Sequence, residues 1–417
     1  MKLVYKFKYN GELNDVLMDY CKSAKDLYNQ ALYLVKQELK SNDKWLSYYE
    51  LDKILKTTKN LEGDINYYKN KSQVSQQVIK KLSNNITAYI RSIKDWSKNK
   101  GKYKGQPKFP KYKEKNALET LVYTNQSCRI KNDGYLYLLK TQKIKIPQFE
   151  KYGSDLMKFN QIHVKPTKGY FEILIVYEKD CLNYDLNQDE YLSIDLGVGN
   201  ICSVINSVDG TAEIYNGKQI KSINQFYNKE KAKLQSLLET NNKKKTSKRL
   251  SSLTEKRNNK INDLLHKTTK HIINQVIKRD IGTIVVGYNR GWKDSIQIGK
   301  RNNQTFVSIP HLKLIEILKY KCEMVGIQLI THEESYTSKC DGLVLEKVGK
   351  HEEYLGKRVK RGLYQSSCGK LINADINGAL NIMRKVVDDS SIEKKIINRG
   401  LLFRPKKFNN LFDLIKY

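Results

Sequence analysis

Two acidic residues in the second half of the chain lie where a metal-dependent reaction needs carboxylates. Asp195 directly follows a strand-like apolar pattern, and Asp375 lies near the start of the helix-like segment Asn373–Val386. Carboxylate oxygens are the hard ligands that Mg²⁺ prefers. Two such ions can activate a water molecule and stabilise the leaving oxygen of a phosphodiester. The residue types therefore favour metal-dependent cleavage of nucleic acid.

Each of these acids also has a simpler structural interpretation. Asp195 could belong to a turn, and Asp375 could be a helix N-cap, a role for which Asn373 competes. Taken together and in this order along the chain, the two acids favour a metal site over either alternative.

The elements around these acids predict an open α/β sheet. Three strands in residues 191–217 form a meander, and a basic helical hairpin follows from Phe226 to Lys278. The unbroken apolar run Ile281–Gly287 is typical of a strand buried on both faces of a parallel sheet. A helix, His311–Val325, a second parallel strand, GIQLITHEE, and the final helix complete the order. This is the ground plan of a ribonuclease H-like fold, whose ligands gather at the carboxyl ends of strands.

The first half combines strands with helices. Residues 2–9 alternate apolar and basic side chains, as a half-buried strand does. Residues 15–96 follow a helical pattern, which ends in a helix from about Ser72 to Trp96. Period-two segments return in 119–178, with a hairpin turn at Asp133–Gly134. We expect these strands to close a small barrel into which the helices are inserted.

Charge points to a polyanionic partner. Lys and Arg number 76 against 44 Asp and Glu, a formal net charge of +32. Residues 98–115, the basic strap, combine lysines with aromatic residues that can stack on bases. A solvated linker is the alternative, which the aromatic residues disfavour. The residues predicted to bind nucleic acid, in the strap and in the helical hairpin, are Lys102, Tyr103, Lys104, Lys108, Phe109, Lys111, Lys243, Lys244, Lys245 and Arg249.

Other classes of protein are disfavoured. No run approaches the roughly 20 apolar residues of a membrane-spanning helix, and the start of the chain lacks the apolar stretch of a signal peptide. The seven cysteines are scattered and form no C-x-x-C pair. We therefore expect reduced thiols and a prokaryotic cytoplasmic protein, associated with the nucleoid when bound to DNA.

Several segments resemble one known family. IDLGVGN, IVVG, ESYTSKC and NADINGALNI are similar to the split nuclease signature of the TnpB (OrfB) proteins, and SQVSQQVIKKL and GQPKFPKYK are similar to its recognition helix and strap. These proteins are transposon-encoded, RNA-guided DNA nucleases related to compact type V CRISPR effectors. The resemblance covers about residues 1–386.

The resemblance implies a multidomain fold of α/β and α+β parts. A wedge-like β-barrel would comprise 1–10 and 116–182, carrying a helical recognition lobe at 11–97. A RuvC-like nuclease domain would comprise 190–338 and 370–386, with an insert at 339–369 and a C-terminal tail at 387–417. The implied partners are a guide RNA and target double-stranded DNA beside a short flanking motif, with no membrane. The implied cofactor is two Mg²⁺ ions, for which Mn²⁺ could substitute.

One departure from the family concerns its catalytic glutamate. The buried strand of the family usually ends in Glu, where this chain has Gly287. Glu333 and Glu334 end the next strand, and neighbouring strands lie about 4.8 Å apart. We expect Glu334, with Glu333 as the alternative, to bind the metal together with Asp195 and Asp375. The simpler interpretation is that both are solvated loop acids.

A second departure concerns the zinc ribbon of the family. Only Cys340 and Cys368 remain of its two C-x-x-C pairs, whereas tetrahedral zinc needs four ligands. His351 has the wrong spacing to help, so we do not expect structural zinc.

These observations predict an RNA-guided, Mg²⁺-dependent DNA endonuclease. A nuclease-inactive, RNA-guided DNA-binding repressor is the alternative, motivated by Gly287. A transposase acting without RNA is a third interpretation, and a small CRISPR effector is a variant of the first.

Overall fold

The computed structural model describes the chain except residues 139–141, 243–245, 290–298, 300–303, 305–307 and 415–417. The chain divides into two compact units, Met1–Lys179 and Asp180–Tyr417. Each unit has its own apolar core, and each is described by itself below.

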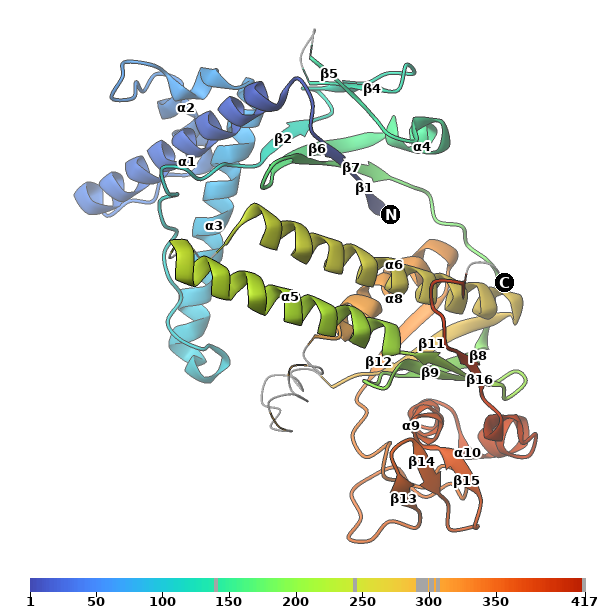
Figure 1. Cartoon of the computed structure of the whole chain (residues 1–417). Helices are drawn as coiled ribbons and strands as arrows, with labels where there is room; N and C mark the ends of the chain where they lie inside the picture. Colours follow the sequence, from blue (N-terminus) through green and yellow to red (C-terminus); the bar gives the residue numbers. More distant parts are fainter. Residues whose placement is uncertain (139–141, 243–245, 290–298, 300–303, 305–307, 415–417) are drawn as a thin grey trace. The chain divides into compact units, whose positions relative to one another are not determined.

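The first unit is built on an antiparallel sheet with the strand order β1-β7-β6-β2 (Figure 1). The strands are β1 (Lys2–Tyr9), β2 (Leu121–Thr124), β6 (Phe159–Pro166) and β7 (Phe171–Glu178). Along β7 buried and half-buried side chains alternate, which confirms the period-two pattern.

A closed barrel is not found among the described residues, which corrects our expectation. The remaining strands of this unit, β3 (Arg129–Ile130), β4 (Tyr135–Tyr137) and β5 (Lys143–Lys145), form a separate sheet. These strands have only two or three residues each. They are too short to bridge the edges β1 and β2. The predicted turn at Asp133–Gly134 does join β3 and β4, with Gly134 at φ +80°.

Helices of the first unit supply many of the other buried residues of its apolar core. They are α1 (Asn14–Asn42), α2 (Tyr48–Leu55), η1 (Asn66–Lys69), α3 (Ser72–Lys98) and α4 (Phe149–Leu156). The predicted stripe of α3 is buried, which confirms that helix. After a short 3₁₀ turn, η2 (Lys100–Lys102), the basic strap has no regular secondary structure, as expected.

The second unit contains a six-stranded sheet with the order β12-β11-β8-β9-β10-β16. Its strands are β8 (Asn187–Asp195), β9 (Asn200–Asn206), β10 (Ala212–Asn216), β11 (Ile281–Gly287), β12 (Gln328–His332) and β16 (Lys406–Phe408). β11 runs parallel to both β8 and β12, and every one of its residues is buried. The predicted meander and the doubly covered parallel strand are therefore confirmed.

Helices cover both faces of this sheet (Figure 1). α6 (Lys248–Lys278) and α8 (His311–Val325) lie on one face with α5 (Lys218–Asn242), and α9 (Ala374–Met383) lies on the other. α5 and α6 form the predicted helical hairpin, although α5 begins before Phe226.

The insert and the tail are ordered elements of this unit. β13 (Lys357–Lys360), β14 (Leu363–Gln365) and β15 (Leu371–Asn373) form a small antiparallel sheet. The tail comprises α10 (Asp389–Ile392), η3 (Glu393–Ile397), η4 (Leu401–Phe403) and β16. β16 pairs with β10, and the Phe408 ring stacks on Tyr215 with 4.9 Å between centroids. The tail therefore docks on the core of the second unit.

Among the described residues, no helix combines the length and apolar character needed to span a membrane.

Candidate active site

Three parallel strands bring the predicted acids to one edge of the second unit's sheet. Val286 of β11 pairs with Ile194 of β8 on one side and with Thr331 of β12 on the other. Asp195 is the last residue of β8, and Glu334 follows the end of β12 by two residues. The carboxyl ends of these strands therefore meet at the same edge, where open α/β sheets bind ligands.

Asp375 reaches this edge from the first turn of α9. The N-cap of this helix is Asn373, whose side chain accepts hydrogen bonds from the backbone N–H groups of Asp375 (3.0 Å) and Ile376 (3.3 Å). Because Asn373 caps the helix, the carboxylate of Asp375 is not needed for that purpose.

A glycine allows α9 to approach Asp195 closely. A Cβ atom placed on Gly378 would lie 3.0 Å from Asp195 Oδ2, which is tighter than ordinary van der Waals contact. A side chain at this position would therefore push the helix away from the carboxylate. Gly378 belongs to the NADINGALNI segment, but spacing alone did not single it out.

Two polar residues that the sequence analysis missed contact Asp375. The side-chain amide of Asn200 donates to Asp375 Oδ2 at 2.7 Å, and Arg358 Nη2 lies 3.7 Å from Asp375 Oδ1. Asn200 lies within the segment IDLGVGN, so that motif contained a usable signal. Arg358 is one of several cations in the exposed strand β13, and no local pattern distinguishes it.

The carboxylate of Glu334 lies over Gly287. A Cβ atom placed on Gly287 would be 3.1 Å from Glu334 Oε2 and 2.4 Å from Ile382 Cδ1. The backbone N–H of Glu334 donates to Asn289 Oδ1 at 3.0 Å, which fixes the start of this loop. Glu334 thus places a carboxylate against the residue where the family usually has its catalytic glutamate.

Glu333 lies differently. This residue is exposed, and its carboxylate accepts a hydrogen bond from the Ser335 hydroxyl. Its backbone carbonyl accepts from Lys385 Nζ at 2.6 Å. The structure therefore brings Glu334, and not Glu333, toward Asp195.

The three carboxylates lie close enough for their charges to affect one another. Burial raises the pKa of Asp195 well above its usual range, and the negative charges of Asp375 and Glu334 raise it further, against Arg358. Burial likewise raises the pKa of Glu334 to about 7, against the opposing charge of Lys385. Like charges held in a poorly solvated place favour a bound cation, whose charge compensates them.

The donor set suits Mg²⁺ in its chemistry but is not a closed cage. Asp195, Glu334 and Asp375 supply carboxylate oxygens, which are hard ligands. Within the described parts of the chain, no three His, Cys, Asp or Glu side chains converge closely enough to hold a metal ion. Because Mg²⁺ keeps several of its waters when it binds protein, water molecules would complete its coordination here.

The insert is held by a buried acid. Cys340 is buried and Cys368 is exposed, while the carboxylate of Asp341 accepts hydrogen bonds from the Ser366 hydroxyl and the Ser367 N–H, both at 2.7 Å. These bonds join the two segments that carry the remaining cysteines.

The residues predicted to bind nucleic acid lie in different surroundings. Tyr103 donates to Asp95 at 2.7 Å, and Lys102 pairs with the same carboxylate at 3.6 Å. Phe109 packs between Trp45 and Tyr89, with centroid distances of 5.7 and 5.2 Å. The exposed cations among them are Lys102, Lys104, Lys108, Lys111 and Arg249, whereas Lys243, Lys244 and Lys245 lie outside the described residues.

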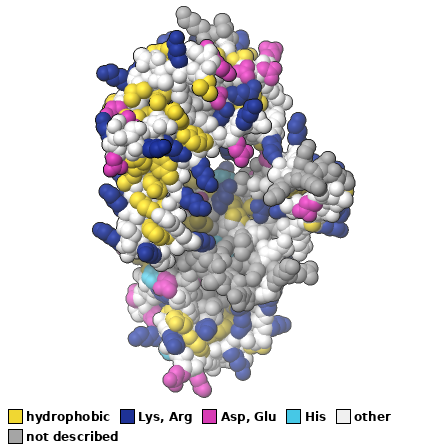
Figure 2. All heavy atoms as spheres, turned by 90° about the vertical axis from the view of Figure 1, so that its left-hand side faces the viewer, with side chains coloured by type: hydrophobic (Ala, Val, Ile, Leu, Met, Phe, Trp, Pro, Cys, Tyr) yellow, Lys and Arg dark blue, Asp and Glu magenta, His cyan; other side chains and the backbone are white. Residues whose placement is uncertain are grey.

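Lys and Arg side chains are spread over the molecular face in Figure 2 and outnumber the acidic ones there. Within the strap, the packing of Phe109 against other aromatic rings holds the segment in place, while the lysines on either side of it face solvent.

Comparison with known proteins shows partial similarity to two family models and to one curated relative. The family described as "OrfB_IS605: Probable transposase" matches residues 174–293, and the family described as "Cas12f1-like, TNB domain" matches residues 311–382. The TnpB-like protein ORF457 of Acidianus two-tailed virus is 28% identical over 204 residues, which are 47% of this chain and 41% of that protein. The chain is therefore similar to TnpB-like proteins over these residues. It spans about two fifths of the length of this curated relative.

A solved structure shares the fold. The protein in the cryo-EM structure of the Cas12f1–sgRNA–target DNA complex matches with a TM-score of 0.54 and 16% sequence identity. The match covers 89% of this chain and 82% of that one. This chain and the protein in that complex therefore share a mixed α/β architecture.

Proposed function

We propose that this chain is an RNA-guided DNA endonuclease whose second unit is a RuvC-like nuclease domain. The observation that carries the proposal is the placement of Glu334 over Gly287, at the sheet edge shared with Asp195 and Asp375. In this proposal Glu334, which follows the adjacent strand, takes the place of the family's usual glutamate, where this chain has Gly287.

The three acids share one role in this proposal, and other residues of the site support them. Asp195, Asp375 and Glu334 would hold Mg²⁺, which would supply an activated water and stabilise the leaving oxygen. Asn200 orients the Asp375 carboxylate through its hydrogen bond. Arg358 balances the negative charge beside Asp375 and is placed to contact a phosphate at the same edge. Gly378 lets α9 bring its acid to this edge.

The basic surfaces would hold nucleic acid through its backbone. The related solved structure contains an sgRNA and target DNA. In a protein of this kind, base pairing to the guide reads sequence, and the protein reads shape and a short motif. The exposed cations Lys104, Lys108, Lys111 and Arg249 fit phosphate contacts.

A groove in the first unit suits the reading of a short flanking motif. Its volume is about 630 Å³, and it lies between α3 and the sheet. Amide side chains can pair with base edges, while lysines contact phosphates. The polar lining residues are Gln77, Lys80, Lys81, Asn84, Asn85, Thr120, Gln161, His163 and Lys165. Replacing the exposed Asn84 by Ala should relax the motif recovered from a library of randomised flanking sequences.

The test is cleavage by the purified ribonucleoprotein. RNA that co-purifies with the protein is sequenced, and matching duplex DNA carrying randomised flanks is supplied with Mg²⁺. We expect site-specific cutting by the wild type and none by Asp195→Ala, which should still bind the same DNA. Wild-type protein that cuts no matched DNA with Mg²⁺ or Mn²⁺ would refute the nuclease assignment.

A guided DNA-binding protein without cleavage is the second candidate. It is favoured by the lack of a closed ligand cage among the described residues and by Gly287. Guide-dependent DNA binding by both wild type and Asp195→Ala, with cutting by neither, would establish it.

A further inference from the structure

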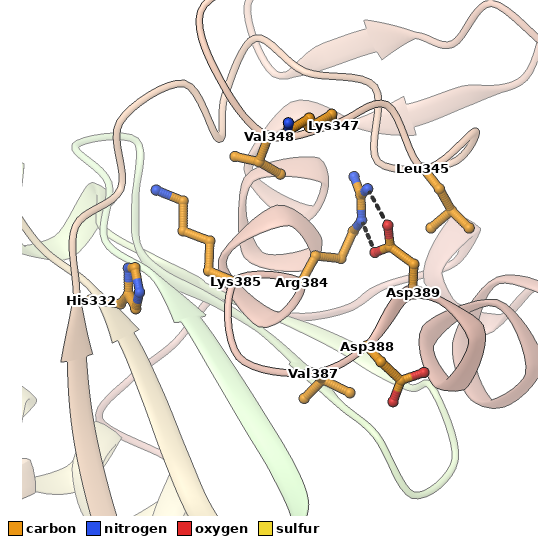
Figure 3. Close-up of a pocket in the computed structure, with 9 residues that line it drawn as sticks. All are labelled: His332, Leu345, Lys347, Val348, Arg384, Lys385, Val387, Asp388 and Asp389. Atoms are coloured by element: carbon orange, nitrogen blue, oxygen red, sulfur yellow. Dashed lines mark hydrogen bonds and ion pairs between the residues drawn. The ribbon is translucent and has the colours of Figure 1, made fainter.

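A cavity of about 550 Å³ in the second unit adjoins the loop that carries Glu334. Its volume is within the range of about 300–1,000 Å³ found for small-molecule sites. Three regions line it: the end of β12, the insert near Lys347, and the residues that follow α9 (Figure 3). None of its lining residues belongs to the proposed metal site.

Because Arg384, Asp388 and Asp389 of the lining already have partners, lysines are the charged groups left to contact a ligand. Arg384 forms a two-fold ion pair with Asp389, at 2.7 and 2.9 Å, drawn with dashed lines in Figure 3. Asp388 caps α10 through the Ser391 N–H at 2.9 Å. The cations that remain are Lys347, which is exposed, and Lys385, which is half-buried.

Lys385 ties the cavity to the Glu334 loop. Its ammonium group donates to the backbone carbonyls on either side of Glu334, those of Glu333 at 2.6 Å and Ser335 at 3.2 Å. An ammonium group has three donors, so the third is available to an anion in the cavity.

The rest of the lining is apolar and amphipathic. Leu345, Val348 and Val387 are the apolar lining residues of the cavity and lie on different sides of it, and His332 lies near Lys385 in Figure 3. A lining that combines apolar side chains with two lysines matches a base or sugar attached to a phosphate.

A second cavity adjoins the same segment of chain. This space of about 310 Å³ shares Val387 and Asp388 with the first cavity and extends to Tyr191 and Lys395. Two cavities along one segment, each with a lysine in its lining, suit an extended strand better than a single small molecule.

We propose that this cavity binds one nucleotide of a DNA single strand, with its phosphate on Lys347 and Lys385. This inference rests on the proposed function, since that strand would lead to or from the carboxylates at the sheet edge. Through its two carbonyl contacts, Lys385 acts as a positioning residue for Glu334 and couples strand binding to the site.

Photo-crosslinking tests the assignment. The full-length protein with its co-purified RNA is irradiated with a single-stranded oligodeoxynucleotide that contains 4-thiothymidine, and cross-linked peptides are mapped. We expect cross-links within residues 345–348 or 384–389. Lys347→Gln should lower their yield about tenfold, the effect of losing one hydrogen bond to a charged group, and Lys347→Arg should restore it.

Lys350→Gln is the matched control, because Lys350 is an exposed lysine of the same loop that does not line the cavity. Equal loss in both Gln variants, or no cross-link in either segment, overturns the proposal. Competition by inorganic phosphate or thymidine monophosphate as strong as that by unlabelled oligonucleotide overturns the strand as occupant.

Cleavage is measured in parallel with the same preparations. Cutting without these cross-links overturns the cavity assignment alone. Cross-links without cutting leave the cavity assignment standing and refute only the nuclease activity.

Discussion

At the scale of single residues, the candidate site depends on a carboxylate supplied by the strand next to the one that ends in Gly287. Gly287 offers no side chain, and the space above it is filled by Glu334 and by Ile382 of α9. A carboxylate displaced by one strand can keep the same target because adjacent strands lie about 4.8 Å apart. This arrangement also favours glycine at position 287, because any side chain there would meet both Glu334 and Ile382.

The two adjacent glutamates should differ sharply when each is made neutral. Glu334→Gln should lower guided cleavage by about 100-fold or more, because a metal ligand contributes several kcal/mol of transition-state stabilisation. Glu333→Gln should leave the rate nearly unchanged, since its carboxylate faces solvent. Single-turnover cleavage rates at saturating Mg²⁺ provide the comparison. Equal losses, or a larger loss for Glu333→Gln, would contradict the placement of Glu334.

Substitution of Gly287 should reveal its close contact with α9. Gly287→Ala would place Cβ 2.4 Å from Ile382 Cδ1, and such overpacking costs about 1–3 kcal/mol. Ile382→Val removes that methyl group and alone costs about 0.5–1.5 kcal/mol. The double variant should be more stable than the sum of the single effects predicts, as measured by urea unfolding. Gly105→Ala, in open space, is the control. Strictly additive effects would show that no such contact exists.

At the scale of elements, the local sequence pattern was enough to predict individual strands and helices. The alternation in β1, the stripe of α3 and the apolar run of β11 each contain their own signal, and the structure confirms them. Asn200 and Arg358 were missed because their importance depends on distant segments that meet only in the folded chain.

The tail and the barrel show the same limit. β16 has the three residues Lys406–Phe408, and its partner β10 lies almost 200 residues earlier, so no local pattern predicts the pairing. Likewise, a set of strands predicts a sheet, but closure into a barrel depends on how its edges meet.

A buried acid helps to anchor the basic strap to the first unit. The side chain of Glu119 is 2% exposed and accepts from Lys81 at 2.6 Å and from Lys113 of the strap. Burial alone would raise the pKa of Glu119, but the hydrogen bonds from Lys113 and Lys81 outweigh it, so the pKa is lowered. A lowered pKa in the folded state means that the charged carboxylate stabilises the fold above the unfolded pKa of about 4.3.

This anchor predicts a pH-dependent variant. Glu119→Gln should cost about 3 kcal/mol at pH 7, because one partner of a buried ion pair is lost. The difference from wild type should shrink as the pH falls below about 4.3, where the unfolded carboxylate becomes protonated, and through the lowered folded pKa. Urea unfolding at several pH values measures this. Glu114→Gln, at an exposed strap acid, should have little effect. A difference that does not change with pH would show that the charged form of Glu119 contributes nothing.

At the scale of the whole molecule, the charge of +32 is the dominant property. Within the strap, aromatic residues brace the chain and lysines face outward. The three acids Asp195, Glu334 and Asp375 gather instead at one sheet edge of the second unit. This separation suits a protein that holds a polyanion over much of its surface and a metal ion at one place.

The charge predicts opposite effects of salt on the bare protein and on its complex with RNA. Bare protein repels itself, and raising NaCl from 0.1 to 1 M shortens the Debye length from about 10 to about 3 Å. Its melting temperature should therefore rise with salt. In the complex, RNA binding stabilises the fold by mass action, and its affinity falls steeply with salt. The melting temperature of the complex should therefore fall toward that of the bare protein.

The two preparations differ only in their RNA, which is removed by nuclease digestion followed by cation exchange at high salt. Melting is followed by intrinsic fluorescence across the salt series, and sucrose at matched osmolality controls for effects that do not depend on charge. The two curves should converge at high salt, because both the repulsion and the RNA contacts are screened there. Curves that move in the same direction would mean that RNA does not neutralise this surface, and the basic excess would then need another partner.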